Sequence, residues 1–134
     1  MIKLHASSLV FALVAVFATG PVLAQGLVGD SSSGKALFDR QCSVCHSLTS
    51  NRIGPVLHNA YGKKAASVPA FNYSKALQSS NIVWDDKTLD QWLAGPQKLI
   101  PGQRMNFIVS DAQKRADIIA YLKVTAETPE EPKK

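Results

Sequence analysis

The chain has 134 residues and a formal net charge of +5, with 15 Lys and Arg against 10 Asp and Glu. This length suits one domain with a modest core, which a large buried cofactor would help to stabilise. The basic excess contains no dense block of Lys and Arg. It therefore favours docking on acidic protein surfaces and argues against nucleic acid as a partner.

The first 24 residues are typical of a secretory signal peptide. An apolar run over 9–18 follows a basic start, is broken by Gly20 and Pro21, and precedes small residues at the −3 and −1 positions of a cleavage site after Ala24. The run is shorter than the ~20 apolar residues that a membrane-spanning helix needs, which argues against an uncleaved anchor. We therefore predict cleavage after Ala24, location in the periplasm, and no stable membrane insertion.

Residues 25–33 are predicted to be a flexible lead-in to the first helix. Ser33 is expected to N-cap this helix, because a serine hydroxyl can accept a hydrogen bond from a backbone N–H of the first turn. The helix should run to about Gln41, with Gly34, Leu37 and Phe38 on its inward face.

Two helices are predicted in the middle of the chain, after a long irregular stretch. The first covers 73–80, with Ser74 as its N-cap. The second covers 85–96 and begins at Asp85 or Asp86. It ends at a Gly-Pro pair, because glycine after the last turn and proline beyond it are typical helix stops.

The C-terminal part is predicted to hold a turn-rich loop over 98–107 and then the last helix. Ser110 followed by Gln113 is a capping box, so the helix should begin there and run to about Val124. The remaining residues, 125–134, are predicted to be a polar tail. No alternating apolar pattern indicates a strand, so the mature domain is predicted to be all-α.

The stretch "CSVCH" at 42–46 holds the only two cysteines of the chain. A redox dithiol would require a preceding strand in a βαβ setting, and the sequence predicts a helix there. A structural zinc site would require four ligands. The mature chain offers only the two cysteines with His46 and His58, so this alternative is also disfavoured.

Covalent haem attachment uses every feature of the same stretch. Thiols at i and i+3 lie on one helical turn, so Cys42 and Cys45 can form thioether bonds to the two vinyl groups of a porphyrin. The next residue, His46, then projects its imidazole toward the iron. Covalent haem attachment takes place outside the cytoplasm, which agrees with export. We therefore predict one haem c and His46 as an iron ligand.

A second iron ligand is predicted from the methionine count. Once Met1 leaves with the signal peptide, Met105 is the only methionine left. It follows a Pro-Gly turn in an irregular loop, far enough along the chain to reach the other face of the haem. His58 lies too close to His46 in sequence to reach that face, and is predicted to be a surface or hydrogen-bonded histidine.

With these residues in place, the chain from 34 to about 123 resembles the class I monohaem cytochromes c, in the small soluble form of mitochondria and proteobacteria. "GKALFDRQCSVCH" is similar to the first helix and haem motif of that family, and "DIIAYLK" to its last helix. The resemblance implies an all-α domain over 34–124 in which these two helices cross and long loops wrap round one haem.

The resemblance also implies roles for individual residues. "RIGPVLHNAYGKK" is similar to the loop that supports the histidine ligand, so the Pro55 carbonyl should accept the imidazole N–H of His46. Tyr73 and Trp84 stand where the family hydrogen-bonds a haem propionate. "TLDQWLAGPQKLIPGQRM" is similar to the segment that ends in the axial methionine, here Met105.

Some positions near the methionine side depart from the family. Trp92 occupies a position often held by tyrosine and is expected to pack on the haem. Gln103 stands where a small hydroxyl residue is common, and Leu77 where a polar one is common. Phe107 is expected to pack near the haem edge. The departures affect the polar network and the tuning of the reduction potential rather than the ligation.

Two axial ligands leave no open site for substrate, so the sequence predicts a one-electron carrier between respiratory or photosynthetic complexes and not an enzyme. Two alternatives stay open: the haem subunit of a dehydrogenase, or a haem enzyme or sensor with a labile sixth ligand. The carrier is expected to be a monomer that docks transiently on acidic patches of membrane complexes or periplasmic dehydrogenases. A basic rim for that docking is predicted from Lys35, Arg40, Arg52, Lys63, Lys64, Lys75, Lys98, Arg104 and Lys114.

Overall fold

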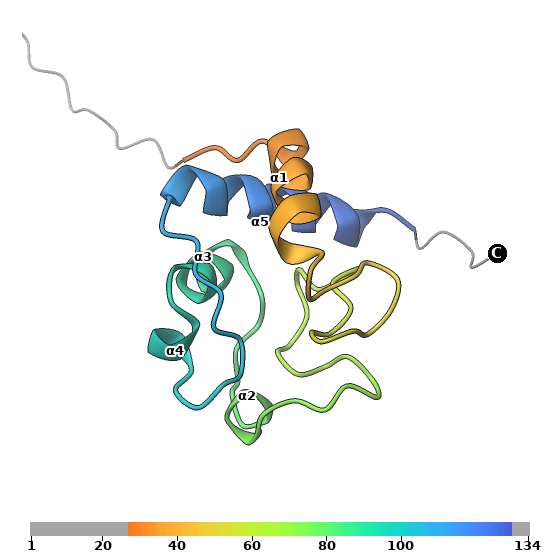
Figure 1. Cartoon of the computed structure of the whole chain (residues 1–134), viewed down its shortest axis with the longest axis vertical. Helices are drawn as coiled ribbons and strands as arrows, with labels where there is room; N and C mark the ends of the chain where they lie inside the picture. The colour runs from red at the N-terminus through yellow and green to blue at the C-terminus, as the bar shows by residue number, and fades with distance from the viewer. Residues whose placement is uncertain (1–26, 130–134) are drawn as a thin grey trace, which may run out of the picture.

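The structure, a computed structural model, describes residues 27–129. The predicted signal peptide with its cleavage site and the last five residues of the predicted tail lie outside this range. No strand forms within it, which confirms the all-α prediction, and no helix in it is long and apolar enough to cross a membrane. Figure 1 shows the helices, which are α1 (Ser31–Leu37), the π-helical turn η1 (Phe38–Cys42), α2 (Lys75–Gln78), α3 (Asp86–Ala94), α4 (Pro96–Leu99) and α5 (Ala112–Glu127).

The first and last helices cross, and a glycine allows the close approach. A Cβ at Gly34 would lie 1.9 Å from the carbonyl oxygen of Asp117 in α5, so no larger residue fits between the two backbones. Beside this point the rings of Phe38 and Tyr121 meet edge to face, with centroids 5.4 Å apart. Figure 1 shows α1 lying across α5 at one end of the molecule. The predicted helix crossing is thus confirmed.

The first helix begins earlier than predicted. Asp30, not Ser33, is the N-cap, and its carboxylate accepts the backbone N–H of Ser33 at 2.7 Å. The backbone N–H of Asp30 in turn donates to the buried carboxylate of Asp117, at 2.9 Å. This contact with α5 selects one cap among several adjacent candidates. Residues 31–33, predicted to belong to the flexible lead-in, are therefore helical.

The last helix also has a different N-cap from the one predicted. Asp111 caps it by accepting the backbone N–H of Lys114 at 3.0 Å, whereas the Ser110 carbonyl accepts from the guanidinium of Arg115 at 2.9 Å. The expected capping partner Gln113 instead donates to Val28 and Asp117. The helix continues past Val124 to Glu127, so the predicted polar tail begins within a helix.

Arg115 joins the last helix to the segment before it. Its Nε donates to Asp90 of α3 at 2.7 Å, and its Nη1 donates to the carbonyl of Val109 at 3.0 Å. The backbone N–H of Val109 donates to Leu93 of α3 at 2.8 Å. The chain that leads from the predicted methionine ligand into α5 is therefore fixed to α3.

The middle helices follow the prediction closely, with one addition. Ser74 caps α2 by accepting from Leu77, and Asp85 caps α3 through a reciprocal capping box with Thr88. Helix α3 ends at Gly95 as predicted. The next residues form α4, one short turn that starts with a proline and occupies part of the segment predicted as a loop. Proline favours this position because its φ is already helical and the first turn needs no N–H from it.

Backbone hydrogen bonds join the loop before α2 to the segment before α3. The N–H of Ala65 donates to the carbonyl of Ile82 at 2.8 Å, and the N–H of Trp84 donates to the carbonyl of Lys63 at 2.9 Å. The N–H of Gly62 donates to the Trp84 carbonyl at 2.7 Å. These contacts fix the backbone of Trp84 on both sides. The buried core lies between this region, α3 and the crossed helices α1 and α5.

Candidate haem-binding site

The two cysteines lie on one turn that extends the first helix. The last part of that helix is a π-helical turn that ends at Cys42, a wider turn than the α-helix that the sequence predicts. The backbone N–H groups of Cys45 and His46 donate to the carbonyl of Cys42, at 3.1 and 2.8 Å. Two thiols at i and i+3 on this turn share one side of it, as thioether attachment requires.

Both cysteine side chains are half-buried, and they do not form a disulfide with each other. Burial raises the pKa of the Cys42 thiol to about 11, so before any covalent attachment this side chain is a neutral thiol at physiological pH rather than a thiolate. Within residues 27–129 no three His, Cys, Asp or Glu side chains gather in one metal-binding group. The zinc alternative therefore lacks a ligand set there. The Nε2 of His58 is buried and has no hydrogen-bond partner, which differs from the surface or bonded histidine predicted.

His46 is held in the tautomer that a metal ligand needs. Its Nδ1–H donates to the carbonyl of Pro55 at 2.8 Å, as the family resemblance implied. A carbonyl can only accept, so Nδ1 carries the proton and Nε2 keeps a free lone pair. Burial lowers the pKa of His46, although the bond to Pro55 partly opposes this, and the imidazole is therefore neutral at pH 7.

Gly54 provides a flat surface for the imidazole. A Cβ at this position would lie 2.3 Å from Cε1 of His46 and 2.7 Å from Nε2. The N–H of Gly54 also donates to the carbonyl of Cys45 at 2.8 Å, which fixes the loop to the cysteine motif. The ring of His46 is thus oriented from two sides, by a hydrogen bond and by backbone contact.

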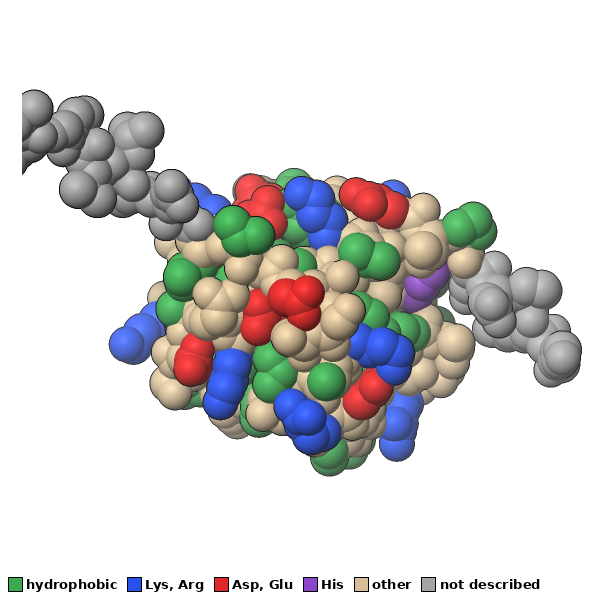
Figure 2. Space-filling model, turned by 90° about the horizontal axis from the view of Figure 1, so that it is seen from above, with side chains coloured by type: hydrophobic (Ala, Val, Ile, Leu, Met, Phe, Trp, Pro, Cys, Tyr) green, Lys and Arg blue, Asp and Glu red, His purple; other side chains and the backbone are tan. Residues whose placement is uncertain are grey.

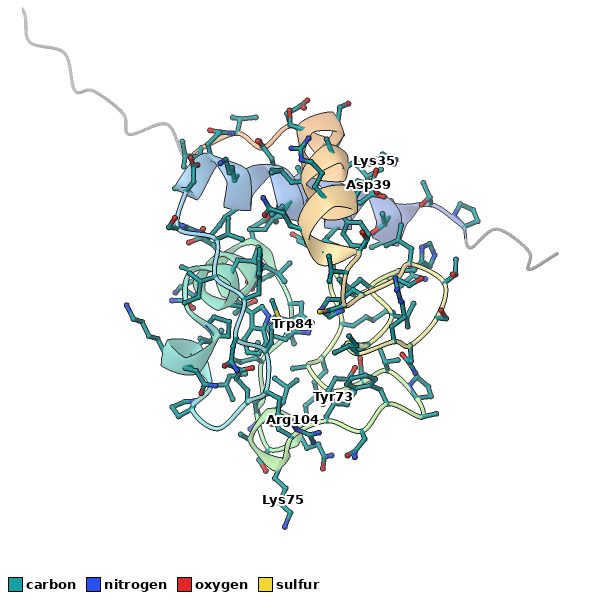
Figure 3. The ribbon with its side chains drawn as sticks, in the orientation of Figure 1. Lys35, Asp39, Tyr73, Lys75, Trp84 and Arg104 are labelled. Atoms are coloured by element: carbon teal, nitrogen blue, oxygen red, sulfur yellow. The ribbon has the colours of Figure 1, made fainter. Side chains whose placement is uncertain are left out.

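Three predicted aromatic residues of the site are wholly or partly buried. Tyr73 and Trp92 are buried, each 8% exposed, and Trp84 is half-buried. The rings of Trp84 and Trp92 pack together with centroids 5.2 Å apart. Figure 3 shows Trp84 near the centre of the ring of chain, between α3 and the loops, with Tyr73 below it. Burial raises the pKa of Tyr73, so its phenol keeps the proton needed to donate a hydrogen bond.

Phe107 is less buried than the other predicted site residues. Its side chain is 42% exposed. With Gln41, the residue before Cys42, it lines a surface pocket of about 330 Å³ beside the start of α5. The predicted contact of Phe107 with the haem edge is compatible with this position but stays a prediction.

Met105 is half-buried, and its backbone is held by Gln103. The side-chain Oε1 of Gln103 accepts the backbone N–H of Met105, and its Nε2 donates to the Met105 carbonyl at 2.6 Å. Gln97 of α4 holds the same loop just before Met105, through hydrogen bonds to the backbone of Gly102 and Gln103. Gln103 departs from the family pattern, but its sequence position alone does not predict these contacts. The only sequence feature that could have suggested these contacts is the presence of two glutamines, Gln103 and Gln97, two and eight residues before Met105.

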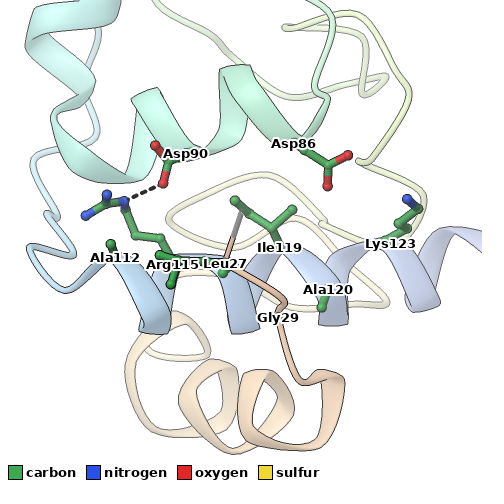
Figure 4. A pocket seen from close by; sticks show the side chains of 10 residues that line it. Leu27, Gly29, Asp86, Asp90, Ala112, Arg115, Ile119, Ala120 and Lys123 are labelled. Carbon is green, nitrogen blue, oxygen red and sulfur yellow. Dashed lines mark hydrogen bonds and ion pairs between the residues drawn. The ribbon is translucent and has the colours of Figure 1, made fainter. Parts of the chain in front are cut away.

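A second pocket lies apart from these residues. It has a volume of about 430 Å³ and lies between α3, α5 and the residues before α1, with the Asp90–Arg115 ion pair at its edge (Figure 4). None of the predicted site residues lines it. It is therefore not the place for the haem.

Comparisons with known proteins agree with this geometry. The profile of the cytochrome c family matches residues 31–126. Cytochrome c2 of Rhodomicrobium vannielii is 42% identical over 98 residues, which cover 70% of this chain and 78% of that protein. Cytochrome c2 of Blastochloris viridis is 38% identical over 120 residues, covering 86% and 91% of the two chains.

A solved structure is also similar. Cytochrome cH from Methylobacterium extorquens superposes with a TM-score of 0.69 at 41% identity, covering 72% of this chain and 99% of that one. The family match starts at the first residue of α1 and ends within α5, so it includes both crossed helices and everything between them. The chain therefore belongs to the cytochrome c family: it is a class I monohaem cytochrome c, an electron carrier whose single haem c is attached through Cys42 and Cys45.

Proposed function

We propose that the protein is a periplasmic one-electron carrier in which His46 and Met105 are the two axial ligands of the iron. The orientation of His46 carries this proposal. Its Nδ1 is occupied by the Pro55 carbonyl, and Gly54 lies against the ring, so Nε2 is the atom that remains for a metal. Met105 supplies a thioether from a loop on a different part of the chain.

The donor set fits a haem c. When bound, the haem supplies an iron that alternates between Fe(II) and Fe(III). Cys42 and Cys45 tether it through thioether bonds and do no redox chemistry themselves. The soft sulfur of Met105 favours Fe(II) and raises the reduction potential. If His46 and Met105 both bind the iron, no ligand position would remain for a substrate, which favours outer-sphere electron transfer.

Two aromatic residues are proposed to bind the haem propionates. The phenol of Tyr73 and the indole of Trp84 each offer a hydrogen-bond donor from the interior. The backbone of Trp84 is fixed by its two bonds to the preceding loop, so the position of its indole is well defined. Trp92 packs against Trp84 and is proposed to cover the haem face on the Met105 side.

Exposed basic residues support transient docking on acidic partners. All nine residues of the predicted basic rim are exposed, but Lys35 is paired with Asp39 at 2.6 Å. Figure 2 shows that acidic and basic side chains are interspersed at the end that carries α1. Figure 3 places Lys75 and Arg104 at the opposite end. We therefore propose that the docking surface is at the end of the molecule opposite α1, where Lys75 and Arg104 lie.

Axial ligation is tested by a redox-titrated optical spectrum of the purified holoprotein. The oxidised protein should show the weak Met–iron charge-transfer band at the red end of the spectrum. Met105→Ala should abolish this band and lower the midpoint potential, because a weaker ligand replaces the thioether. His58→Ala is the matched control and should leave both unchanged. An unchanged band in Met105→Ala would contradict the carrier with two protein ligands and favour an enzyme or sensor.

A further inference from the structure

Gln103 is a buried amide whose two polar atoms are both used on one residue. The side chain is 5% exposed, although it lies in an irregular loop. Its Oε1 accepts the backbone N–H of Met105, and its Nε2 donates to the backbone carbonyl of Met105 at 2.6 Å. One side chain thus satisfies the donor and the acceptor of a loop residue that belongs to no helix.

A second glutamine fixes the loop from α4. The Oε1 of Gln97 accepts the backbone N–H of Gly102 at 3.1 Å, and its Nε2 donates to the backbone carbonyl of Gln103 at 2.9 Å. The same Nε2 lies 3.2 Å from the side-chain oxygen of Asn106. Hydrogen bonds therefore run from α4 through Gln97 to Gln103 and from there to Met105.

We propose that Gln103 is a positioning residue that holds Met105 on the iron, and that Gln97 supports it. This inference rests on the proposed function, because it requires Met105 to be the sixth ligand. Movement of the Met105 backbone away from the iron would break both bonds to Gln103, so these bonds oppose opening of the loop. A serine or threonine hydroxyl has a single oxygen and is too short to bond both backbone groups of Met105. The departure at 103 therefore makes the methionine ligand harder to displace.

The affinity of the oxidised protein for imidazole tests the proposal. Imidazole binds iron only after Met105 leaves, so its apparent affinity reports how often the loop opens. Gln103→Met keeps the shape of the side chain and removes both hydrogen bonds. It should bind imidazole about 10- to 30-fold more tightly than the wild type, since each net hydrogen bond contributes up to about one decade in the opening equilibrium. Gln97→Leu, at an exposed position, should shift the affinity in the same direction by a smaller factor.

Gln113→Met is the matched control. Gln113 also makes two side-chain hydrogen bonds, to the Val28 carbonyl and to Asp117, but it holds the N-terminal segment rather than Met105. This variant should lose thermal stability and keep its imidazole affinity within about twofold of the wild type. If Gln113→Met changes the affinity as much as Gln103→Met, the effect is general destabilisation and the proposal is overturned.

Hydrogen exchange in the unmutated protein gives an independent readout that needs no variant to fold. The Met105 amide should exchange much more slowly than an unbonded loop amide, because Gln103 accepts its hydrogen bond. Exchange at the rate of an unbonded amide would overturn the proposal. Absence of the Met–iron band in the wild type would overturn both this inference and the proposed ligation. A present band with unchanged imidazole affinity in Gln103→Met and Gln97→Leu would overturn only the role of Gln103.

Discussion

Gly54 lies against the imidazole of His46 so closely that a Cβ on it would be 2.3 Å from Cε1. The ring cannot turn away from this contact without losing its 2.8 Å hydrogen bond to Pro55. The conformation of the histidine is therefore fixed by a residue that carries no functional group. A substitution at Gly54 tests how strongly the ligand geometry depends on this backbone contact.

We predict that Gly54→Ala displaces His46 and destabilises the holoprotein by more than about 2 kcal/mol, because the added methyl would overlap the imidazole ring. Chemical denaturation of the purified holoprotein measures the loss, and the spectrum reports the altered ligation. Gly95→Ala is the control, because its added Cβ would meet the flexible end of Lys98 at 3.2 Å. Equal stability of the two variants would contradict the prediction.

A second prediction concerns the close contact between α1 and α5 at Gly34. Gly34→Ala should cost about 3 kcal/mol or more, since the new methyl would meet the carbonyl of Asp117 at 1.9 Å and backbone cannot move aside as a side chain can. Thermal unfolding measures the effect. Ser32→Ala, an exposed substitution in the same helix, should change the melting temperature little. A Gly34→Ala protein as stable as Ser32→Ala would show that the helices can separate freely.

The stability of the fold should decrease at acid pH, because the carboxylates that cap two of the helices become protonated. Backbone hydrogen bonds from Thr88 and Lys114 lower the pKa values of Asp85 and Asp111 below their ordinary 3.8. A carboxyl with a lower pKa in the folded state stabilises the fold above its unfolded pKa, and this contribution is lost as the pH falls through the folded value. Thermal unfolding over a pH series should therefore show a decline below about pH 4.

The double variant Asp85→Asn, Asp111→Asn separates this effect from general acid unfolding. Asparagine still caps a helix but does not titrate, so the decline should be shallower than in the wild type. Parallel curves for the two proteins would mean that other groups cause the acid dependence.

Electron transfer should respond to salt according to the charge of the partner. Oxidation by the anion ferricyanide should slow as ionic strength rises, because salt screens its attraction to the basic surface. Oxidation by a cationic cobalt complex should not slow, because salt screens its repulsion from the same surface. Stopped-flow rates measure both. Lys75→Gln and Arg104→Gln should reduce the ferricyanide rate more than Lys35→Gln, since Lys35 is already paired with Asp39. Salt-independent rates with both oxidants would exclude the basic docking surface.

If the protein is exported and cleaved as predicted, its mature mass and N-terminus follow. The mature protein isolated from the periplasmic fraction should begin at Gln25 and carry one haem. Intact-mass spectrometry with N-terminal sequencing checks both features. A product that retains Met1, or that fractionates with the membrane, would contradict cleavage after Ala24.

The parts of the fold that could be predicted from sequence are those decided by neighbouring residues. Asp85 and Gly95 mark the ends of α3 because capping and stop signals act within one turn. The start of α1 could not be predicted in the same way. Its cap depends on Asp117, which lies 87 residues from Asp30, and the sequence near Asp30 offers several equivalent caps. A local pattern contains no information about such a contact.

The same distinction applies to the candidate site. The spacing of Cys42, Cys45 and His46 follows from haem chemistry, so it could be recognised directly. The hydrogen bond between His46 and the Pro55 carbonyl was predicted from the family resemblance, and the structure confirms it. Neither residue spacing nor the family resemblance predicted the two hydrogen bonds from Gln103 to Met105. An amide that bonds a residue two positions away in a loop produces no periodic pattern in the sequence.

The loop that carries Met105 is fixed on both sides. Gln97 holds it on the α4 side, and Arg115 holds the carbonyls of Val109 and Ser110 after it. The speed of electron exchange depends on how far atoms must shift when the charge of the metal changes. If Met105 is a ligand, this bracing would restrict how far its sulfur can move when the charge of the metal changes. Arg115, which touches neither the ligand nor the proposed docking surface, would then contribute to a low reorganisation energy and so to rapid self-exchange.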